Sequence, residues 1–177
     1  MKPRGMLMIE HRLIEKVLVV ANNKAKAMTA KTFDPLFVDA IVDFIRVYAD
    51  RTHHGKEEEI LFQRLASMKL NSSDARMMAE LIDEHTQARS KVKAIREFNE
   101  KFKRGDTAAA LEIAKIIDWL AAFYPIHIQK EDKVFFPNTE PYFSASELDA
   151  LLVEFNEFDR KMIHEKYQNV YRELSQI

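Results

Sequence analysis

The chain has 177 residues, 47% of them hydrophobic, and its 27 basic and 28 acidic side chains nearly cancel to a formal net charge of −1. The lack of cysteine excludes disulfides, thiolate metal ligands and cysteine nucleophiles, and the sequence has neither a basic tract that indicates a nucleic-acid partner nor an apolar run that indicates a membrane partner. Charged residues come so soon after residues 1–8 that no room is left for the apolar core of a signal peptide. We therefore expect a soluble cytoplasmic protein.

Long helices are expected along the whole chain, because it contains only three glycines and five prolines. The spacing of apolar residues predicts a first helix over about 6–28, with His11 inside its apolar stripe. A second helix is predicted over about 35–68. Asp34 suits its N-cap, and Pro35 suits its first position.

The second predicted helix carries polar residues on its inner face and one irregularity. His53 and Glu57 lie on that face, one turn apart. Gly55 costs about 1 kcal/mol relative to alanine in a helix interior, and it indicates either a kink or the close approach of another backbone. Lys56 and the glutamates that follow Glu57 are interpreted as a solvated face.

The third and fourth predicted helices each bring one more histidine to an apolar face. A third helix is expected from the start signal at Asn71 to a stop at Gly105, and His85 interrupts its apolar stripe. A fourth helix is expected from about 106 to between 132 and 135, and His127 shares its buried side.

The segment after the fourth helix, residues 137–141, is predicted to be the clearest loop of the protein, because a proline stands at each of its ends. Ser144 and Glu147 have the spacing of a capping box. A fifth helix is therefore expected over about 144–175.

No segment has the alternating, β-branched pattern of a strand. We therefore predict an all-α fold, an up-down four-helix bundle over about 7–136 with an additional C-terminal helix over about 144–175. The length suits a single domain that comprises residues 1–177.

Two ten-residue stretches repeat one pattern. Residues 53–62 read HHGKEEEILF, and residues 127–136 read HIQKEDKVFF. In each, a histidine is followed four residues later by a glutamate, and an apolar tail ends in phenylalanine. Residues four apart share a helix face, so both side chains can reach a common point. Two copies indicate two helices that present matched ligands to one site.

The four helices of the predicted bundle together supply six polar side chains on inner faces: His11, His53, Glu57, His85, His127 and Glu131. A lone histidine on an apolar face is more often a hydrogen-bonded core residue than a ligand. Four histidines with two glutamates need partners, however, because an unsatisfied buried polar group costs about 1–3 kcal/mol and a buried carboxylate costs more. Imidazole and carboxylate ligands suit iron, manganese or zinc. Two ions bridged by the two carboxylates would use all six side chains.

A second assignment of the histidine and glutamate ligands in residues 53–62 is also open. His54 and Glu58 repeat the spacing one residue later, about 100° round the helix, and are an alternative to His53 and Glu57. The alignment of the two repeats favours His53 and Glu57. The remaining histidine of the C-terminal third, His164, is expected to be exposed.

In these residues the sequence resembles the hemerythrin-like family, the HHE cation-binding domain. That family has a histidine on the first helix, a His-x-x-x-Glu with a Leu-Phe tail on the second, a histidine on the third and a second His-x-x-x-Glu on the fourth. The resemblance covers about residues 7–137. It implies that the six side chains hold a non-haem di-iron centre in which Glu57 and Glu131 bridge and an oxo or hydroxo group lies between the irons. Manganese or zinc is the alternative metal.

Oxygen-carrying members of that family have a second histidine on the third helix. This chain has Leu81 and Arg89 at the positions one turn from His85. The resemblance therefore implies that water or another side chain completes one iron, which favours reaction with dioxygen, peroxide or nitric oxide over simple oxygen carriage. Two alternatives are a cation-sensing or iron-storage module that acts through a protein partner, and a metal-free helical interaction domain.

Overall fold

The computed structural model describes residues 2–29 and 31–174, apart from the side chains of residue 167 and residues 169–174. Within these ranges all regular structure is helical and no strand occurs. The elements are α1 (Pro3–Ala27), α2 (Pro35–Phe44), η1 (Ile45–His54), η2 (Glu57–Phe62), α3 (Gln63–Ala66), α4 (Ser72–Lys103), α5 (Ala109–Lys130), η3 (Glu131–Phe135), α6 (Phe136–Thr139), η4 (Glu140–Tyr142) and α7 (Ala145–Leu174). No helix of the described chain is both long enough and apolar enough to span a membrane.

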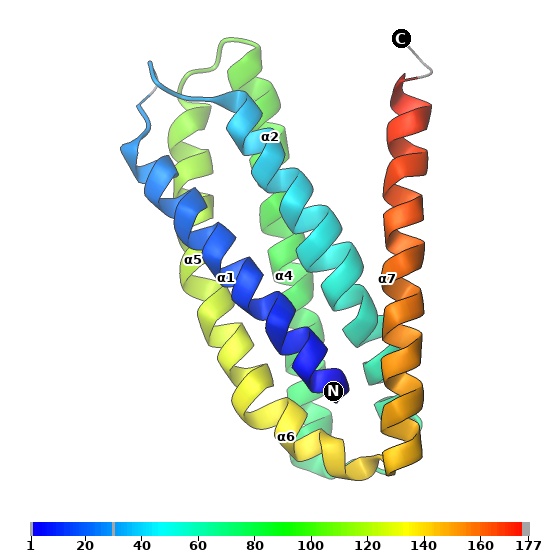
Figure 1. Ribbon diagram of the computed structural model, residues 1–177. Helices are drawn as coiled ribbons and strands as arrows, with labels where there is room; N and C mark the ends of the chain where they lie inside the picture. The colour runs from blue at the N-terminus through cyan, green and yellow to red at the C-terminus, as the bar shows by residue number, and fades with distance from the viewer. Residues whose placement is uncertain (1, 30, 175–177) are drawn as a thin grey trace.

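These elements join into five long helical segments, because α2 runs on through η1, η2 and α3, and α5 runs on through η3, α6 and η4. Helix α1 packs against α5, α5 against α4, and α4 against α2 and η1 (Figure 1). Helix α7 packs against α1, η1 and η2. The prediction of an all-helical chain is confirmed. The π-helical turns η1, η2 and η3 were not predicted.

The predicted helix ends are held by the side chains that the sequence indicated. Asp34 accepts hydrogen bonds from the backbone N–H groups of Leu36 and Phe37 at 3.1 and 3.2 Å. The Glu147 carboxylate accepts from the Ser144 N–H at 2.7 Å, and the Glu147 N–H donates to the Ser144 hydroxyl, which completes the capping box.

The prediction of a loop over 137–141 is wrong. Residues of this segment form α6 and the 3₁₀ turn η4, with Pro137 in the first turn of one element and Pro141 in the first turn of the other. Proline is tolerated there, because its missing N–H has no intrahelical partner in any case. The preceding Phe135 and Phe136 are buried and fix the segment against the core.

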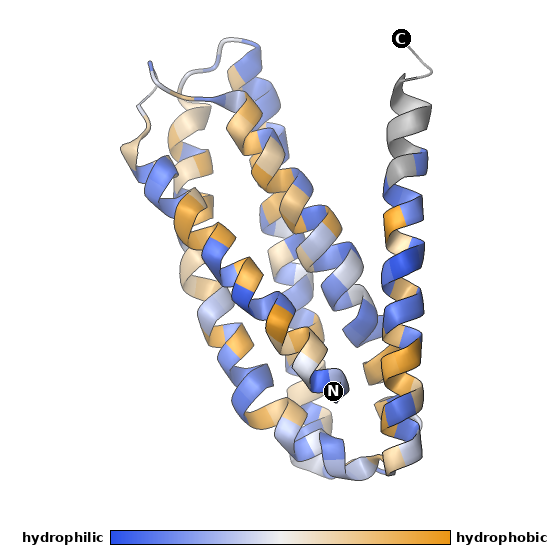
Figure 2. Cartoon of the chain, in the orientation of Figure 1, coloured by the Kyte–Doolittle hydropathy of each residue, from blue (hydrophilic) through white to orange (hydrophobic). Residues whose placement is uncertain are grey.

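The core consists of two apolar clusters stacked along the helices. Ile14, Ala49 and Ala88 belong to one cluster, and Leu7 and Leu81 belong to the other. Figure 2 shows hydrophobic and hydrophilic residues alternating along the helices, as expected for segments with one buried stripe. On the first four long helical segments the clusters leave a layer between them, and this layer is polar.

The C-terminal helix explains the glycine in the second helical segment. A methyl group added at Gly55 would come within 2.8 Å of Cζ of Phe158 on α7. The close approach expected at this glycine therefore comes from a side chain of α7.

Candidate metal centre

The polar layer between the two apolar clusters contains all six predicted ligands and one further histidine, His54. Their side chains come from α1, η1, η2, α4, α5 and η3. Each of the seven residues is at most 2% exposed: His11, His53, His54, Glu57, His85, His127 and Glu131. His164, in contrast, is exposed on α7, as expected.

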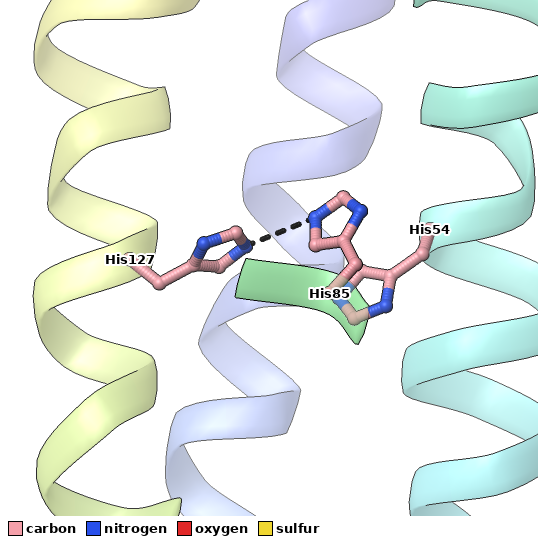
Figure 3. A group of neighbouring side chains, drawn as sticks. All are labelled: His54, His85 and His127. Atoms are coloured by element: carbon pink, nitrogen blue, oxygen red, sulfur yellow. Dashed lines mark hydrogen bonds between the residues drawn. The ribbon is translucent and has the colours of Figure 1, made fainter. Parts of the chain in front are cut away.

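The seven side chains form two groups. Within each group, the potential ligand atoms all lie within 4.8 Å of one another. The first group is His11, His53, Glu57 and Glu131, and the second is His54, His85 and His127. Figure 3 shows the three rings of the second group, which η1, α4 and α5 direct toward one another. In that group Nε2 of His85 lies 3.2 Å from Nε2 of His127.

The two glutamates of the first group also face the second. One carboxylate oxygen of Glu57 lies 3.5 Å from Nε2 of His53, and the other lies 3.5 Å from Nε2 of His85. Glu131 places one oxygen 3.1 Å from Nε2 of His11 and 3.4 Å from Nε2 of His127. Each carboxylate therefore connects the two groups.

His54 belongs to the centre in addition to the six predicted side chains, which the sequence did not indicate. Adjacent residues on a helix point about 100° apart, and the second helical segment lies between α1 and α4. His53 faces α1, where its ring centroid lies 4.5 Å from that of His11, and His54 faces α4, where its ring stacks on His85 at 3.8 Å. The histidine doublet thus holds members of both groups. Glu58, the partner of His54 in the alternative assignment, lies outside both groups.

Every histidine of the two groups has a carboxylate at its other ring nitrogen. The Nδ1–oxygen distances are 2.8 Å for His11–Asp132, 2.7 Å for His53–Glu10, 3.4 Å for His54–Asp50, 2.6 Å for His85–Glu58 and 2.8 Å for His127–Glu84. The four contacts of 2.6–2.8 Å fix the imidazole tautomer with the proton on Nδ1 and direct the basic Nε2 atom inward, whereas the His54–Asp50 contact is long for a hydrogen bond.

A basic side chain in turn contacts each of these outer carboxylates. The pairs are Arg12–Asp132, Lys56–Glu10, Arg89–Glu58, Arg89–Asp50 and Lys130–Glu84. The interpretation of Lys56 as part of a solvated face is wrong. Its side chain is 0% exposed beneath α7, where Nζ also lies 2.6 Å from Asp159. Sequence alone gives no sign of this burial, because a lysine on a helix is ordinarily exposed.

The inward-facing atoms lack ordinary partners. Among the described residues, no hydrogen-bond partner is present for Nε2 of His11, His53 and His54, or for either carboxylate oxygen of Glu57 and Glu131. Leaving one such buried atom unsatisfied costs about 1–3 kcal/mol. Cations bound between the two groups would satisfy these atoms together, so the residues present fit a metal.

In the metal-free protein the centre holds protons where cations would bind. Burial alone would lower the pKa of His11, but the hydrogen bond to Asp132 and the nearby carboxylate of Glu131 outweigh it and raise that pKa to about 9. Burial lowers the pKa of His53 to about 4, so this imidazole is neutral at pH 7. Burial and the charge of Glu131 raise the pKa of Glu57. Cation uptake would therefore release protons.

One comparison with known proteins gives a match. A family model described as the hemerythrin HHE cation-binding domain matches residues 3–139, which include all seven side chains of the two groups. No curated protein and no solved structure matches the chain.

Proposed function

The chain belongs to the hemerythrin HHE cation-binding domain family, and from that premise we propose that it is a non-haem di-iron protein that binds, senses or reduces a small oxidant such as dioxygen, peroxide or nitric oxide. In this proposal the first four long helical segments form an up-down four-helix bundle around the metals. Helix α7 is the additional C-terminal helix of the same domain.

The observation that carries the proposal is the set of unsatisfied inward-facing atoms, shared between two adjacent groups. His11 and His53 would hold one ion, the three histidines of the second group would hold the other, and the two glutamates would bridge them. Imidazole and carboxylate suit iron, and a dinuclear carboxylate centre is a common cofactor of helix bundles. Manganese and zinc accept the same donors, so metal analysis is part of the test.

The ligand count supports a site for an external ligand at one ion. His54 would be the other side chain that completes the ligand set, which would bring the centre to five imidazoles and two carboxylates despite Leu81 and Arg89 on α4. The absent third-helix histidine therefore no longer argues against reversible oxygen binding. The ion near His11 and His53 has one fewer imidazole, so it has more room for a small oxidant.

The protein surrounds this centre with aromatic rings. Phe136 lies 6.1 Å from His11, Phe62 lies 6.2 Å from His85 and Phe123 lies 5.8 Å from His127, measured between ring centroids. Apolar walls of this kind exclude bulk water and strengthen the electrostatic interactions inside. Bound iron would supply the redox chemistry, while the chain orients the ligands and limits access.

Elemental analysis of protein purified without chelator tests the proposal. We expect close to two irons per chain, in line with the two groups, and a visible spectrum that changes when nitric oxide or hydrogen peroxide is added. Glu57→Ala and Glu131→Ala should each release metal and lower stability, because ligation is coupled to folding. His164→Ala is the matched control, and its metal content should be unchanged. Full iron content in both glutamate variants would contradict the bridging role.

A non-catalytic sensing role is the second candidate, and the burial of Lys56 favours it. Lys56 connects Glu10, the partner of His53, to Asp159 on α7. Metal occupancy could thereby alter α7 and a protein partner bound there. Sensing without catalysis predicts slower amide hydrogen exchange in α7 on metal binding, together with no turnover of peroxide or nitric oxide.

A further inference from the structure

A cavity of about 330 Å³ opens between η1, α4 and α5, beside the three-histidine group. His54 contributes to its lining. Small-molecule sites in proteins commonly measure about 300–1,000 Å³. The cavity is therefore larger than a diatomic or triatomic oxidant requires, and it lies beside the group that has three histidines.

The mouth of this cavity is strongly basic, although the chain as a whole has a net charge of −1. Asp50 is the single acidic side chain that lines the cavity. The basic side chains that line it are Arg46, Arg89, Lys93 and Arg96. Arg89 is committed to Asp50 and Glu58, at 2.7 and 2.8 Å. Among the described side chains, no carboxylate lies within ion-pair distance of Arg46 or Arg96. Both are exposed, so their positive charges are available to an anion.

The interior of the cavity is mainly apolar and has two polar groups without a partner among the described residues, Nε2 of His54, which is assigned to the metal centre, and the hydroxyl of Tyr124. Ile45, Ala88 and Val92 form buried walls. Tyr124 also lines the cavity and is 1% exposed, and its hydroxyl has no hydrogen-bond partner among the described residues. A tyrosine hydroxyl is protonated at neutral pH and can donate a hydrogen bond. An unsatisfied buried hydroxyl favours a ligand that offers it an acceptor.

We propose that this cavity binds a small organic monocarboxylate as a second ligand, distinct from the oxidant. Its carboxylate lies at the mouth with Arg46 and Arg96, because a carboxylate buried farther in would lose hydration without a dedicated cation. Its apolar body contacts the walls. An acceptor at its far end receives the hydrogen bond of Tyr124, next to His54.

Isothermal titration calorimetry with benzoate and benzamide tests the charge requirement, because the two molecules have nearly the same shape. We expect the protein as purified to bind benzoate at least tenfold more tightly than benzamide, as a charge-assisted contact implies. The double variant Arg46→Gln/Arg96→Gln should remove this preference without weakening benzamide. The control is Arg76→Gln, which removes one exposed charge from α4 about 30 Å from Arg96. Equal binding of the two probes, or an equal loss in the control, overturns the proposal.

The orientation is tested with 4-hydroxybenzoate, which carries an oxygen opposite its carboxylate. It should bind about fivefold more tightly than benzoate, and Tyr124→Phe should abolish that difference while leaving benzoate affinity unchanged. A difference that persists in the phenylalanine variant contradicts the contact. Metal content measured on the same samples separates this inference from the di-iron proposal. Purified protein that contains no iron but binds benzoate would contradict the di-iron proposal and support this inference.

Discussion

His54→Leu is the substitution that most directly separates ligation from packing at the centre. Leucine has about the volume of histidine and no polar atom, so it fills the space of a ring that is 1% exposed. In the metal-free protein the imidazole contributes little. Its Nε2 has no hydrogen-bond partner among the described residues, and its Nδ1 lies 3.4 Å from Asp50, which is long for a hydrogen bond.

The expected effects on the two states have opposite signs. Removing an unsatisfied buried nitrogen should raise the free energy of unfolding of the metal-free protein by about 1 kcal/mol. Metal binding should weaken, because one of three imidazoles in the second group is lost. Loss of an outer-shell partner alone typically costs 10–100-fold in metal affinity, so loss of a direct ligand should cost more than about 100-fold, or about 3 kcal/mol.

The assay combines iron analysis after dialysis against a weak chelator with urea unfolding of the metal-free protein. Iron should fall from two toward one per chain in His54→Leu, since only one of the two groups has lost a ligand. The control is His164→Leu, at an exposed histidine, which should retain its iron. Undiminished iron in His54→Leu would refute the assignment of this residue as a ligand. A loss of metal-free stability that parallels the loss of iron would instead indicate a packing role.

Three further predictions concern the surroundings of the centre. The folded-state pKa of His11 is raised from 6.5 to about 9, so its contribution to stability is complete below pH 6.5 and is lost as pH rises through 9. In urea unfolding of the metal-free protein, the free energy of unfolding should therefore decrease by about 3 kcal/mol between pH 6.5 and 9. Lys56→Met leaves Glu10 without its buried cation and should destabilise by about 3 kcal/mol in chemical denaturation, and an unchanged midpoint would show that the buried pair is dispensable. Gly55→Ala places a methyl group 2.8 Å from Phe158 and should lower thermal stability by about 1–3 kcal/mol, with Phe158→Ala restoring tolerance of the alanine; additive losses would contradict the steric explanation.

Helical periodicity predicted most of the fold and six of the seven clustered side chains, because the histidines interrupt apolar stripes that are otherwise regular. It did not reveal His54 as an additional member, because a single buried face, the one that holds His53 and Glu57, is predicted for the second helix. That segment has neighbours on two sides, α1 and α4, so two faces about 100° apart are buried. The doublet His53-His54 was the available signal. A pair of adjacent histidines suits a helix that is buried on two sides.

The remaining errors arose where tertiary contacts override local preference. Lys56 has the character of a surface residue, but α7 covers it and supplies Asp159 as a partner. Nothing near Lys56 in the sequence indicates that a helix about one hundred residues later packs there. Residues 137–141 have the composition of a loop, yet prolines in first-turn positions permit helical turns, and the buried Phe135 and Phe136 hold them in place.

If the centre binds cations, the position of Lys56 couples the C-terminal helix to them. Its ammonium group is shared between Glu10 in the interior and Asp159 on α7. Displacing α7 would withdraw one of these two counter-charges and leave Glu10, the hydrogen-bond partner of His53, as the sole carboxylate for that cation. Coupling of this kind is reciprocal, so cation binding at the centre would alter how firmly α7 is held by as much as docking of α7 alters the affinity for the cation. Cation binding in the buried centre would thereby change the stability of α7 at the surface of the protein.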